Sequence, residues 1–324
     1  MLLIFAILSW GAVKIPFNEI VSIVLGSNAE EDAFRQIIWE LRLPRAFCSM
    51  LAGASLGLAG LLMQTFFQNP LAGPFVLGIH SGSSLAVAFW IMTGTALGIT
   101  LPESVAVAGV TFSSILGGAA VFFMLLMVSM KIKGNIILLV IGLLFGYFTS
   151  GLISLLISVT DAQKIKTFLM WTLGSFQGKT AFELIMLSLI LGMGLIWSLY
   201  LGKRLNVLLL GEEYALSLGL NFKRFKIETL LLTSLLSGAV TSLCGPVAFV
   251  GIMAPHIARK LFSSQDHFVL IPGSFVIGSI LCLVAEFLSG LGVTLVVPIN
   301  AILGLFGAPF IVFFLFGKRR FRDA

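Results

Sequence analysis

Hydrophobic residues run in long stretches along this chain, and short polar segments with most of the charge separate them. Several stretches have about 20 residues, the length that an α-helix needs to cross the hydrocarbon core of a bilayer. We place crossings at residues 1–13, 46–66, 75–98, 104–130, 136–159, 182–200, 227–244, 246–257, 268–289 and 297–317. The ranges 1–13 and 246–257 are shorter than a full crossing requires. The pattern predicts an all-α membrane protein with about ten transmembrane helices.

Composition agrees with this pattern. Hydrophobic residues make up 58% of the chain and charged residues 10%, whereas an ordinary soluble domain is about 25% charged. This excludes a water-soluble enzyme. Because no polar segment is longer than a loop, we expect one transmembrane domain over residues 1–324, with its energy source in another chain or an ion gradient. Glycines spaced along the second crossing (Gly53, Gly57, Gly60) and in the fifth (Gly142, Gly146) predict close helix packing.

The net charge of +6 comes from basic residues that lie mostly in short loops. Lys and Arg mark the cytoplasmic side of a membrane protein because they are not readily translocated. With ten crossings and the basic segment 318–320 inside, most basic residues fall on the cytoplasmic side. We therefore predict that both termini are cytoplasmic.

One cytoplasmic stretch, residues 206–221, contains signals for a short separate helix. Gly211 can end one turn, Glu212 and Glu213 favour the start of the next through the helix dipole, and Gly219 can close it. The expected element is a short helix across the membrane surface. It is either an interfacial loop or a docking surface for a cytoplasmic partner.

Glu286 is the ionisable residue deepest in a predicted crossing. A carboxyl group in lipid is a functional candidate because a charge there is costly. Glu286 is either the relay of an ion-coupled secondary transporter or a buried structural acid. The cluster at residues 80–82 lacks the pattern of a hydrolase nucleophile. The three cysteines lie in apolar runs, which is typical of buried thiols.

Several segments in order resemble the permease subunits of type II ATP-binding-cassette importers, the family that carries iron-siderophores, haem and vitamin B12. They are Leu-Arg-Leu-Pro-Arg at 41–45, Met-Gln at 63–64, Gln-Asn-Pro-Leu-Ala at 68–72, Leu-Gly-Ile at 77–79 with Gly82, Leu-Gly-Glu at 210–212, Leu-Gly-Leu at 218–220, Phe-Val-Gly at 249–251, Pro-His-Ile-Ala-Arg at 255–259, Ile-Pro-Gly at 271–273 and Gly-Ala-Pro at 307–309. The ordered set is far more specific than any one segment.

The resemblance implies a homodimer of ten-helix subunits in the inner (plasma) membrane of a bacterial cell. Two cytoplasmic ATPase subunits would bind ATP and Mg²⁺, and a periplasmic or extracellular binding protein would deliver the cargo. This chain would be a permease and not an enzyme, with no cofactor, metal or catalytic residue of its own and no nucleic-acid partner. The sequence does not distinguish siderophore, haem, cobalamin or oxyanion cargo.

The resemblance also implies roles for particular residues. The coupling helix that seats in the ATPase would include Gly211, Glu212, Glu213, Ala215, Leu218 and Gly219. Arg42 and Arg45 would dock the binding protein, although membrane anchoring by these side chains is the alternative. The path and its gate would include Gln64, Asn69, Pro70, Leu71 and His80, where a plain interhelical turn is the alternative for 69–72. His80 would either touch a haem iron or pack between helices.

Departures from the family pattern concern the last two crossings, among them Val296 in place of a Glu before Pro298. Gly290 stands where relatives often have an Arg, which removes one expected docking cation. Asn300 stands where Gly is usual, and Glu286 where Asp is common. The resemblance therefore favours a structural role for Glu286.

Overall fold

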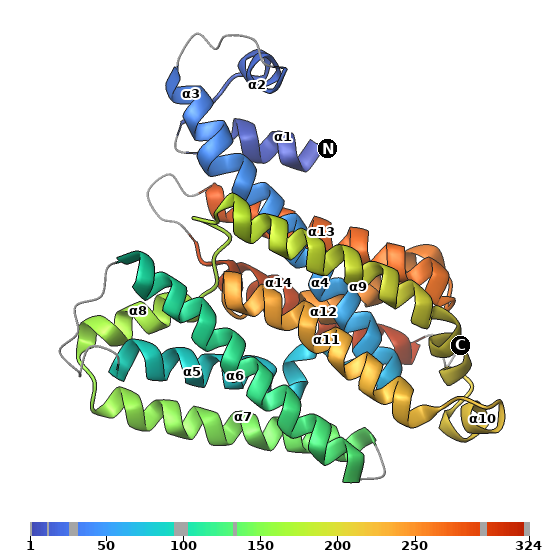
Figure 1. Ribbon diagram of the computed structural model, residues 1–324. Helices are drawn as coiled ribbons and strands as arrows, with labels where there is room; N and C mark the ends of the chain where they lie inside the picture. Colours follow the sequence, from blue (N-terminus) through green and yellow to red (C-terminus); the bar gives the residue numbers. More distant parts are fainter. Residues whose placement is uncertain are drawn as a thin grey trace.

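The computed structural model describes residues 2–11, 13–25, 32–93, 103–131, 135–291 and 297–320, and the part of the chain that it describes is helical without strands (Figure 1). The helices in chain order are α1 (Leu2–Ser9), α2 (Phe17–Val24), α3 (Asp32–Gln36), η1 (Ile37–Arg42), α4 (Leu43–Phe66), η2 (Pro74–Leu77), α5 (Ile79–Thr93), α6 (Glu103–Lys131), α7 (Asn135–Ser158), α8 (Ala162–Thr172), α9 (Ala181–Leu208), α10 (Glu212–Ser217), α11 (Phe222–Cys244), α12 (Val250–Phe262), α13 (His267–Gly290) and α14 (Ile299–Arg320). The predicted all-α fold is confirmed.

Each of the ten predicted ranges contains a helix. Among the described residues, six helical segments are long and apolar enough to cross a membrane: Ala33–Phe66, Val105–Lys131, Ile137–Ser158, Ala181–Leu208, Phe222–Cys244 and His267–Gly290. The α1 helix has 8 residues and is therefore about 12 Å long, well short of a bilayer core of about 30 Å. The described part of the first predicted range thus does not span on its own.

The structure also contains helices that the hydrophobic pattern did not reveal. The α2 helix is short and amphipathic, and α8 contains Lys164 and Lys166, so neither forms a continuous apolar run. The stretch before Leu43 continues through α3 and η1 into α4, as the unbroken blue helix of Figure 1 shows. The second predicted range therefore extends by about four turns at its N-terminal side.

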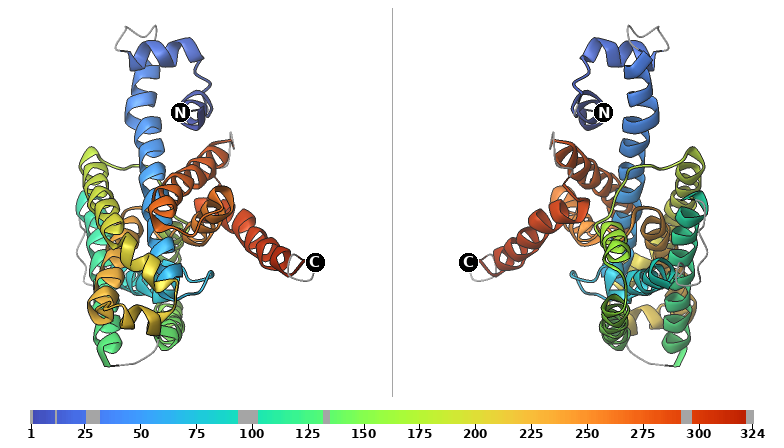
Figure 2. Two further views of the ribbon diagram at one scale, coloured as in Figure 1. Left: turned by 90° about the vertical axis from the view of Figure 1, so that its right-hand side faces the viewer. Right: turned by 90° about the vertical axis from the view of Figure 1, so that its left-hand side faces the viewer.

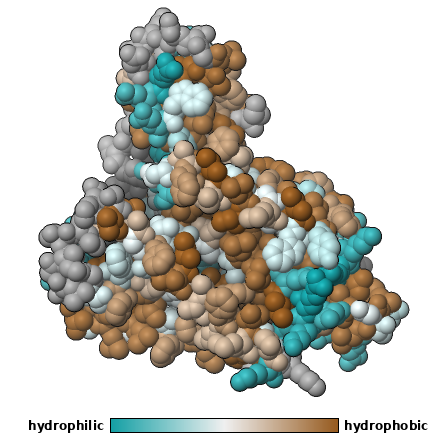
Figure 3. Space-filling model, in the orientation of Figure 1, coloured by the Kyte–Doolittle hydropathy of each residue, from teal (hydrophilic) through white to brown (hydrophobic). Residues whose placement is uncertain are grey.

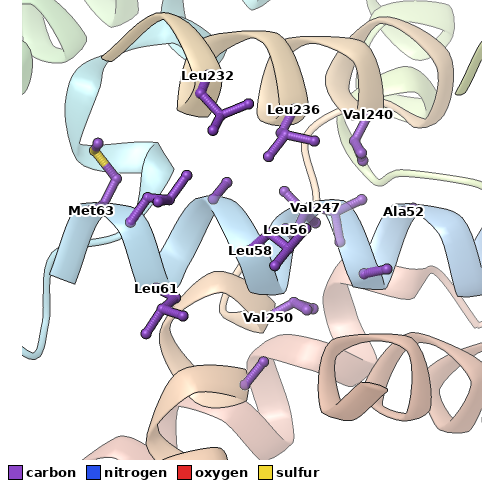
Figure 4. Packing of buried hydrophobic residues seen from close by; sticks show 14 of the residues in the cluster. Ala52, Leu56, Leu58, Leu61, Met63, Leu232, Leu236, Val240, Val247 and Val250 are labelled. Atoms are coloured by element: carbon purple, nitrogen blue, oxygen red, sulfur yellow. The ribbon is translucent and has the colours of Figure 1, made fainter. Parts of the chain in front are cut away.

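The α4 helix is the centre of the bundle, packed against α9, α11, α12 and α13. In Figure 4, α4 runs between Leu232, Leu236 and Val240 of α11 on one side and Val250 of α12 on the other, with Leu61 on the side of Val250. A Cβ atom added at Gly53, Gly57 or Gly60 would overlap a backbone carbonyl oxygen of α12 or α13. The predicted role of these glycines is confirmed, because only a hydrogen side chain permits this approach.

Two parts of the chain stand away from the centre. The α1–α3 segment caps one end of the bundle, and α14 projects from its side (Figure 2). The α10 helix lies at the other end, where α4, α6, α9 and α12 finish and α11 and α13 begin (Figure 1). We call this the α10 end of the bundle. Several basic residues share it: Lys131, Lys203, Arg204, Lys223, Arg224, Lys226, Arg259 and Lys260.

Candidate functional site

The predicted short surface helix exists as α10, and a glycine bounds it on each side. Its role in coupling to an ATPase stays a prediction. Gly211 has φ 103° and ψ 156°, a backbone conformation that is almost restricted to glycine. Gly219 has φ 84°, and its N–H donates to Leu216 O at 2.9 Å while Leu220 N–H donates to Ala215 O at 3.0 Å. This pair of bonds is a Schellman motif, the common glycine-dependent helix end. Local sequence therefore determines both ends of α10.

The surface of α10 is apolar on the side away from the bundle. Ala215 is buried against the protein, whereas Tyr214 and Leu218 are each 58% exposed. Leu209, Leu210 and Leu216 are also exposed, and Glu213 lies at the surface with Glu212 only half-buried. The arrangement is an apolar knob with carboxylates at its N-terminal turn, which suits contact with another protein surface.

A charged cluster adjoins this knob on α9 and α11. Arg204 Nη1 lies 2.5 Å from Glu228 Oε2, and Arg224 Nε lies 2.7 Å from Glu228 Oε1. The hydrophilic patch beside α10 in Figure 3 interrupts a mostly hydrophobic surface, and it covers the ends of these helices. Charged side chains therefore gather at the α10 end, and the placement of this end in the cytoplasm stays a prediction.

The predicted gate turn, residues 69–72, begins directly after α4. Asn69 N–H donates to Gln64 O at 3.1 Å, which ends the helix, and Asn69 Oδ1 accepts from Leu71 N–H at 2.9 Å. Pro70 and Leu71 are exposed at the α10 end of the bundle. The backbone breaks here as expected, because proline cannot continue the helix. The role of the turn as a gate stays a prediction.

Gln64 lies in the last turn of α4 and is buried among polar groups of α12. Its Nε2 donates to Ile252 O at 3.1 Å, and its Oε1 accepts from Arg259 Nη1 at 2.5 Å. Gln64 Nε2 also lies 3.4 Å from His256 Nδ1. The sequence placed Gln64 on the path, and the structure adds that it joins α4 to α12.

His80 is 3% exposed near the start of α5. Its Nδ1 lies 2.5 Å from Thr241 Oγ1, and its ring stacks on Phe75 with centroids 3.9 Å apart. Its Nε2 has no hydrogen-bond partner among the described residues. In this conformation His80 packs between helices, and the predicted contact with cargo is untested.

Arg42, expected at a docking surface, is instead buried at 7% exposure. Its guanidinium donates to Leu8 O at 2.5 Å and also to Val13 O. These carbonyl groups lie at and beyond the end of α1, where helical partners are missing. Arg42 therefore holds α1 against the chain, and its docking role stays a prediction.

Arg45 forms an ion pair with Glu286, whose side chain is 2% exposed on α13. A buried carboxylate needs such a partner, since an unpaired charge in an apolar environment is costly. The structural interpretation of Glu286 has direct geometric support in this pair. Arg45 itself is 25% exposed, so part of it remains open for the predicted docking.

Asn300 is a site that the sequence marked only as a departure. Its Nδ2 donates to Thr172 O at 3.0 Å and to Pro246 O at 2.5 Å, and its Oδ1 accepts from Ala248 N–H at 3.1 Å. A glycine could make none of these bonds. Asn300 thus joins α14 to the end of α8 and to the loop before α12.

Among the described residues, no group of His, Cys, Asp and Glu could hold a metal ion.

The chain is similar to known proteins along most of its length. The model of the FecCD transport family matches residues 1–317. The hemin transport system permease protein HmuU of Yersinia pestis is 30% identical over 329 residues, with 100% of this chain and 96% of that protein covered. The vitamin B12 import system permease protein BtuC of Serratia proteamaculans is 31% identical over 288 residues, which cover 88% and 83%.

A solved structure has the same fold. It is described as an inward-facing conformation of a metal-chelate type ABC transporter, and it superposes with a TM-score of 0.82 at 26% sequence identity. The match covers 98% of this chain and 97% of that one. The similarity therefore extends from the N-terminal helices through α14.

Proposed function

Since the chain belongs to the FecCD transport family, we propose that it is the permease subunit of an ATP-driven importer for a metal chelate. The cargo class is an iron-siderophore, haem or cobalamin, carried from a binding protein into the cytoplasm. The names of its relatives, for hemin and vitamin B12, support this class, because both are metals held in an organic chelate. The family is one of transport permeases, so the chain is not itself an enzyme. ATP and Mg²⁺ belong to the partner ATPase.

The observation that carries the proposal is α10. It places exposed Leu and Tyr side chains on a glycine-bounded helix at the charged end of the bundle. An apolar patch rimmed by polar residues is typical of a protein-binding surface. The occupant that we propose is the cytoplasmic ATPase, with α10 as the element that receives its motion.

The proposal extends to the rest of the assembly. A second copy of the chain completes the path, and the binding protein docks at the end opposite α10, where Arg45 is partly open. The chain is a multi-pass membrane protein. We propose the inner (plasma) membrane of a bacterial cell as its location, with both termini in the cytoplasm.

Copurification tests the proposal. The tagged chain, co-expressed with its neighbouring genes and extracted in mild detergent, should carry an ATPase in equal amounts. Replacement of both α10 carboxylates (Glu212→Lys with Glu213→Lys) should abolish this recovery, because it reverses the charge of the knob. A chain that never retains an ATPase would contradict the proposal.

Asp161→Lys is the matched control for that charge reversal. Asp161 is an 84% exposed carboxylate at the start of α8, at the end opposite α10. The same change of charge there should leave ATPase recovery as in the unsubstituted chain. Equal loss in both variants would mean that net charge, and not α10, controls assembly.

A further inference from the structure

Two hydrogen-bonded links join the last turn of α4 to the last turn of α9. The first is direct: Gln68 Nε2 donates to Leu208 O at 2.8 Å. The same carbonyl oxygen accepts Gly211 N–H at 3.0 Å, from the residue directly before α10. One carbonyl group therefore contacts both the residue before the gate turn and the residue before α10.

The second link passes through His267, at the start of α13. His267 Nδ1 lies 2.6 Å from Asn206 Oδ1, an acceptor, so Nδ1 carries the proton and Nε2 accepts from Thr65 Oγ1 at 2.7 Å. Asn206 Nδ2 donates in turn to Asp266 Oδ1 at 2.7 Å. Thr65 and His267 are 4% and 1% exposed. The chain of donors and acceptors has one consistent direction, which holds the imidazole in place.

The residue at position 68 is unusual for its backbone. Gln68 has φ 48°, in the left-handed region that favours glycine. Its N–H donates to Thr65 O at 3.2 Å and the next N–H donates to Gln64 O, so α4 ends in the same Schellman motif as α10. At the equivalent position α10 has Gly219. Glutamine is strained in this backbone conformation, whereas glycine would not be. Unlike glycine, however, glutamine has a side chain that can donate a hydrogen bond to Leu208 O.

We propose that Gln68 and the Thr65–His267–Asn206 chain are positioning residues that transmit a displacement of α10 to the gate turn. Only a few residues separate the end of α4 from the gate turn and the end of α9 from α10. A displacement of α10 therefore moves the end of α9, and the hydrogen-bonded links pass it to the end of α4 and the gate turn. The inference rests on the proposed function, in which α10 receives the motion of the ATPase.

Spin-label distances in the purified permease–ATPase complex test it. Labels go on an introduced cysteine at Lys203, exposed near the end of α9, or at Leu71, exposed in the gate turn. The native Cys48, Cys244 and Cys282 are buried and should not react. Each label in a homodimer reports the distance between the two copies. Addition of Mg²⁺ and a non-hydrolysable ATP analogue should change both distances in the otherwise unsubstituted complex.

The combined variant Gln68→Gly with Thr65→Val should keep the change at position 203 and lose the change at position 71. Glycine suits the left-handed backbone and valine matches threonine in shape, so the complex should still assemble. Thr229→Val is the control, because the hydroxyl of the buried Thr229 donates to Phe225 O of its own helix at 2.8 Å. It should keep both changes.

The possible outcomes distinguish a failure of this inference from a failure of the proposed function. A change at position 71 that survives in the combined variant would overturn this inference and leave the proposed function intact. No change at either position in the unsubstituted complex would overturn both, since there would be no displacement to transmit. Loss of both changes in the combined variant, with assembly intact, would also overturn the inference, because the links would then be needed for α9 to move at all.

Discussion

The two ends of α4 are anchored by different chemistry. At its N-terminal end, Arg42 and Arg45 bind carbonyl groups near α1 and the carboxylate of Glu286. At its C-terminal end, Gln64, Thr65 and Gln68 bind through neutral amide and hydroxyl groups to an Arg, a His and backbone carbonyls. A charge that loses its buried partner is far more costly than a neutral hydrogen bond that changes partner. The contacts at the N-terminal end of α4 are therefore suited to a fixed position, and those at the C-terminal end are suited to rearrangement.

The largest effect should come from breaking the ion pair at the N-terminal end. Arg45→Met leaves Glu286 as an unpaired buried carboxylate and should destabilise the protein by about 3–5 kcal/mol. Thermal unfolding in detergent measures the loss. The double variant Arg45→Met with Glu286→Leu should recover most of it, because no charge is left uncompensated. If Arg45→Met alone were as stable as the parent, the pair would not be an anchor.

Removal of the second arginine should have a smaller and more local effect. Arg42→Met leaves the carbonyl groups of Leu8 and Val13 without their donor, at a cost of about 1–3 kcal/mol for a buried group. Hydrogen exchange should become faster in α1 while the central bundle keeps its protection. Arg42→Lys, which cannot reach both acceptors as a planar fork does, should be intermediate. Unchanged exchange with weaker binding-protein affinity would instead support the docking role alone.

A neutral anchor at the C-terminal end should matter less to stability. Thr65→Val removes the hydroxyl donor to His267 and should lower the free energy of unfolding by about 1 kcal/mol. Thermal unfolding beside Thr229→Val, which loses an intrahelical bond only, isolates the cost of the link between helices. A loss as large as that of Arg45→Met would remove the contrast between the two ends.

The smallest effect concerns pH at the same end. Hydrogen bonds from the Asn206 side chain and from Phe268 N–H hold the pKa of Asp266 below its ordinary value of 3.8. The carboxylate therefore stabilises the fold fully above that value, and the contribution is lost as pH falls through the lower folded pKa. The stability difference between the parent and Asp266→Asn should be present near neutral pH and disappear in strong acid. A stability difference that persists in strong acid would mean that the shape of the Asp266 side chain, and not its charge, causes the difference.

Much of the architecture could be predicted because apolar runs and helix-end signals are local. Every predicted crossing contains a helix, and the glycines around α10 determined its position from short-range conformational preferences. The helices α2 and α8 could not be predicted in the same way, since polar residues interrupt their apolar faces. The roles given to the candidate site residues came from the resemblance and not from the hydrophobic pattern, and they stay predictions.

The partners of the polar residues were beyond sequence reasoning. Thr65 and His267 are 202 positions apart, and no local pattern indicates that their side chains meet. The same holds for Arg45 and Glu286, whose pairing changes the meaning of both residues. Arg42 was expected at the surface, and it is buried because the end of α1 supplies carbonyl groups that need a donor.

The sequence by itself determined that this chain is a helical membrane protein, which of its segments are apolar helices and where its short surface helix is bounded by glycine. Those properties depend on the length of apolar runs and on single-residue backbone preferences, which act over one or two turns. The tertiary structure alone decided which charges are neutralised, which helices pack against the glycines of α4 and which side chains form hydrogen bonds between the ends of α4 and α9. These depend on contacts between distant segments, and such contacts exist only after the bundle has packed.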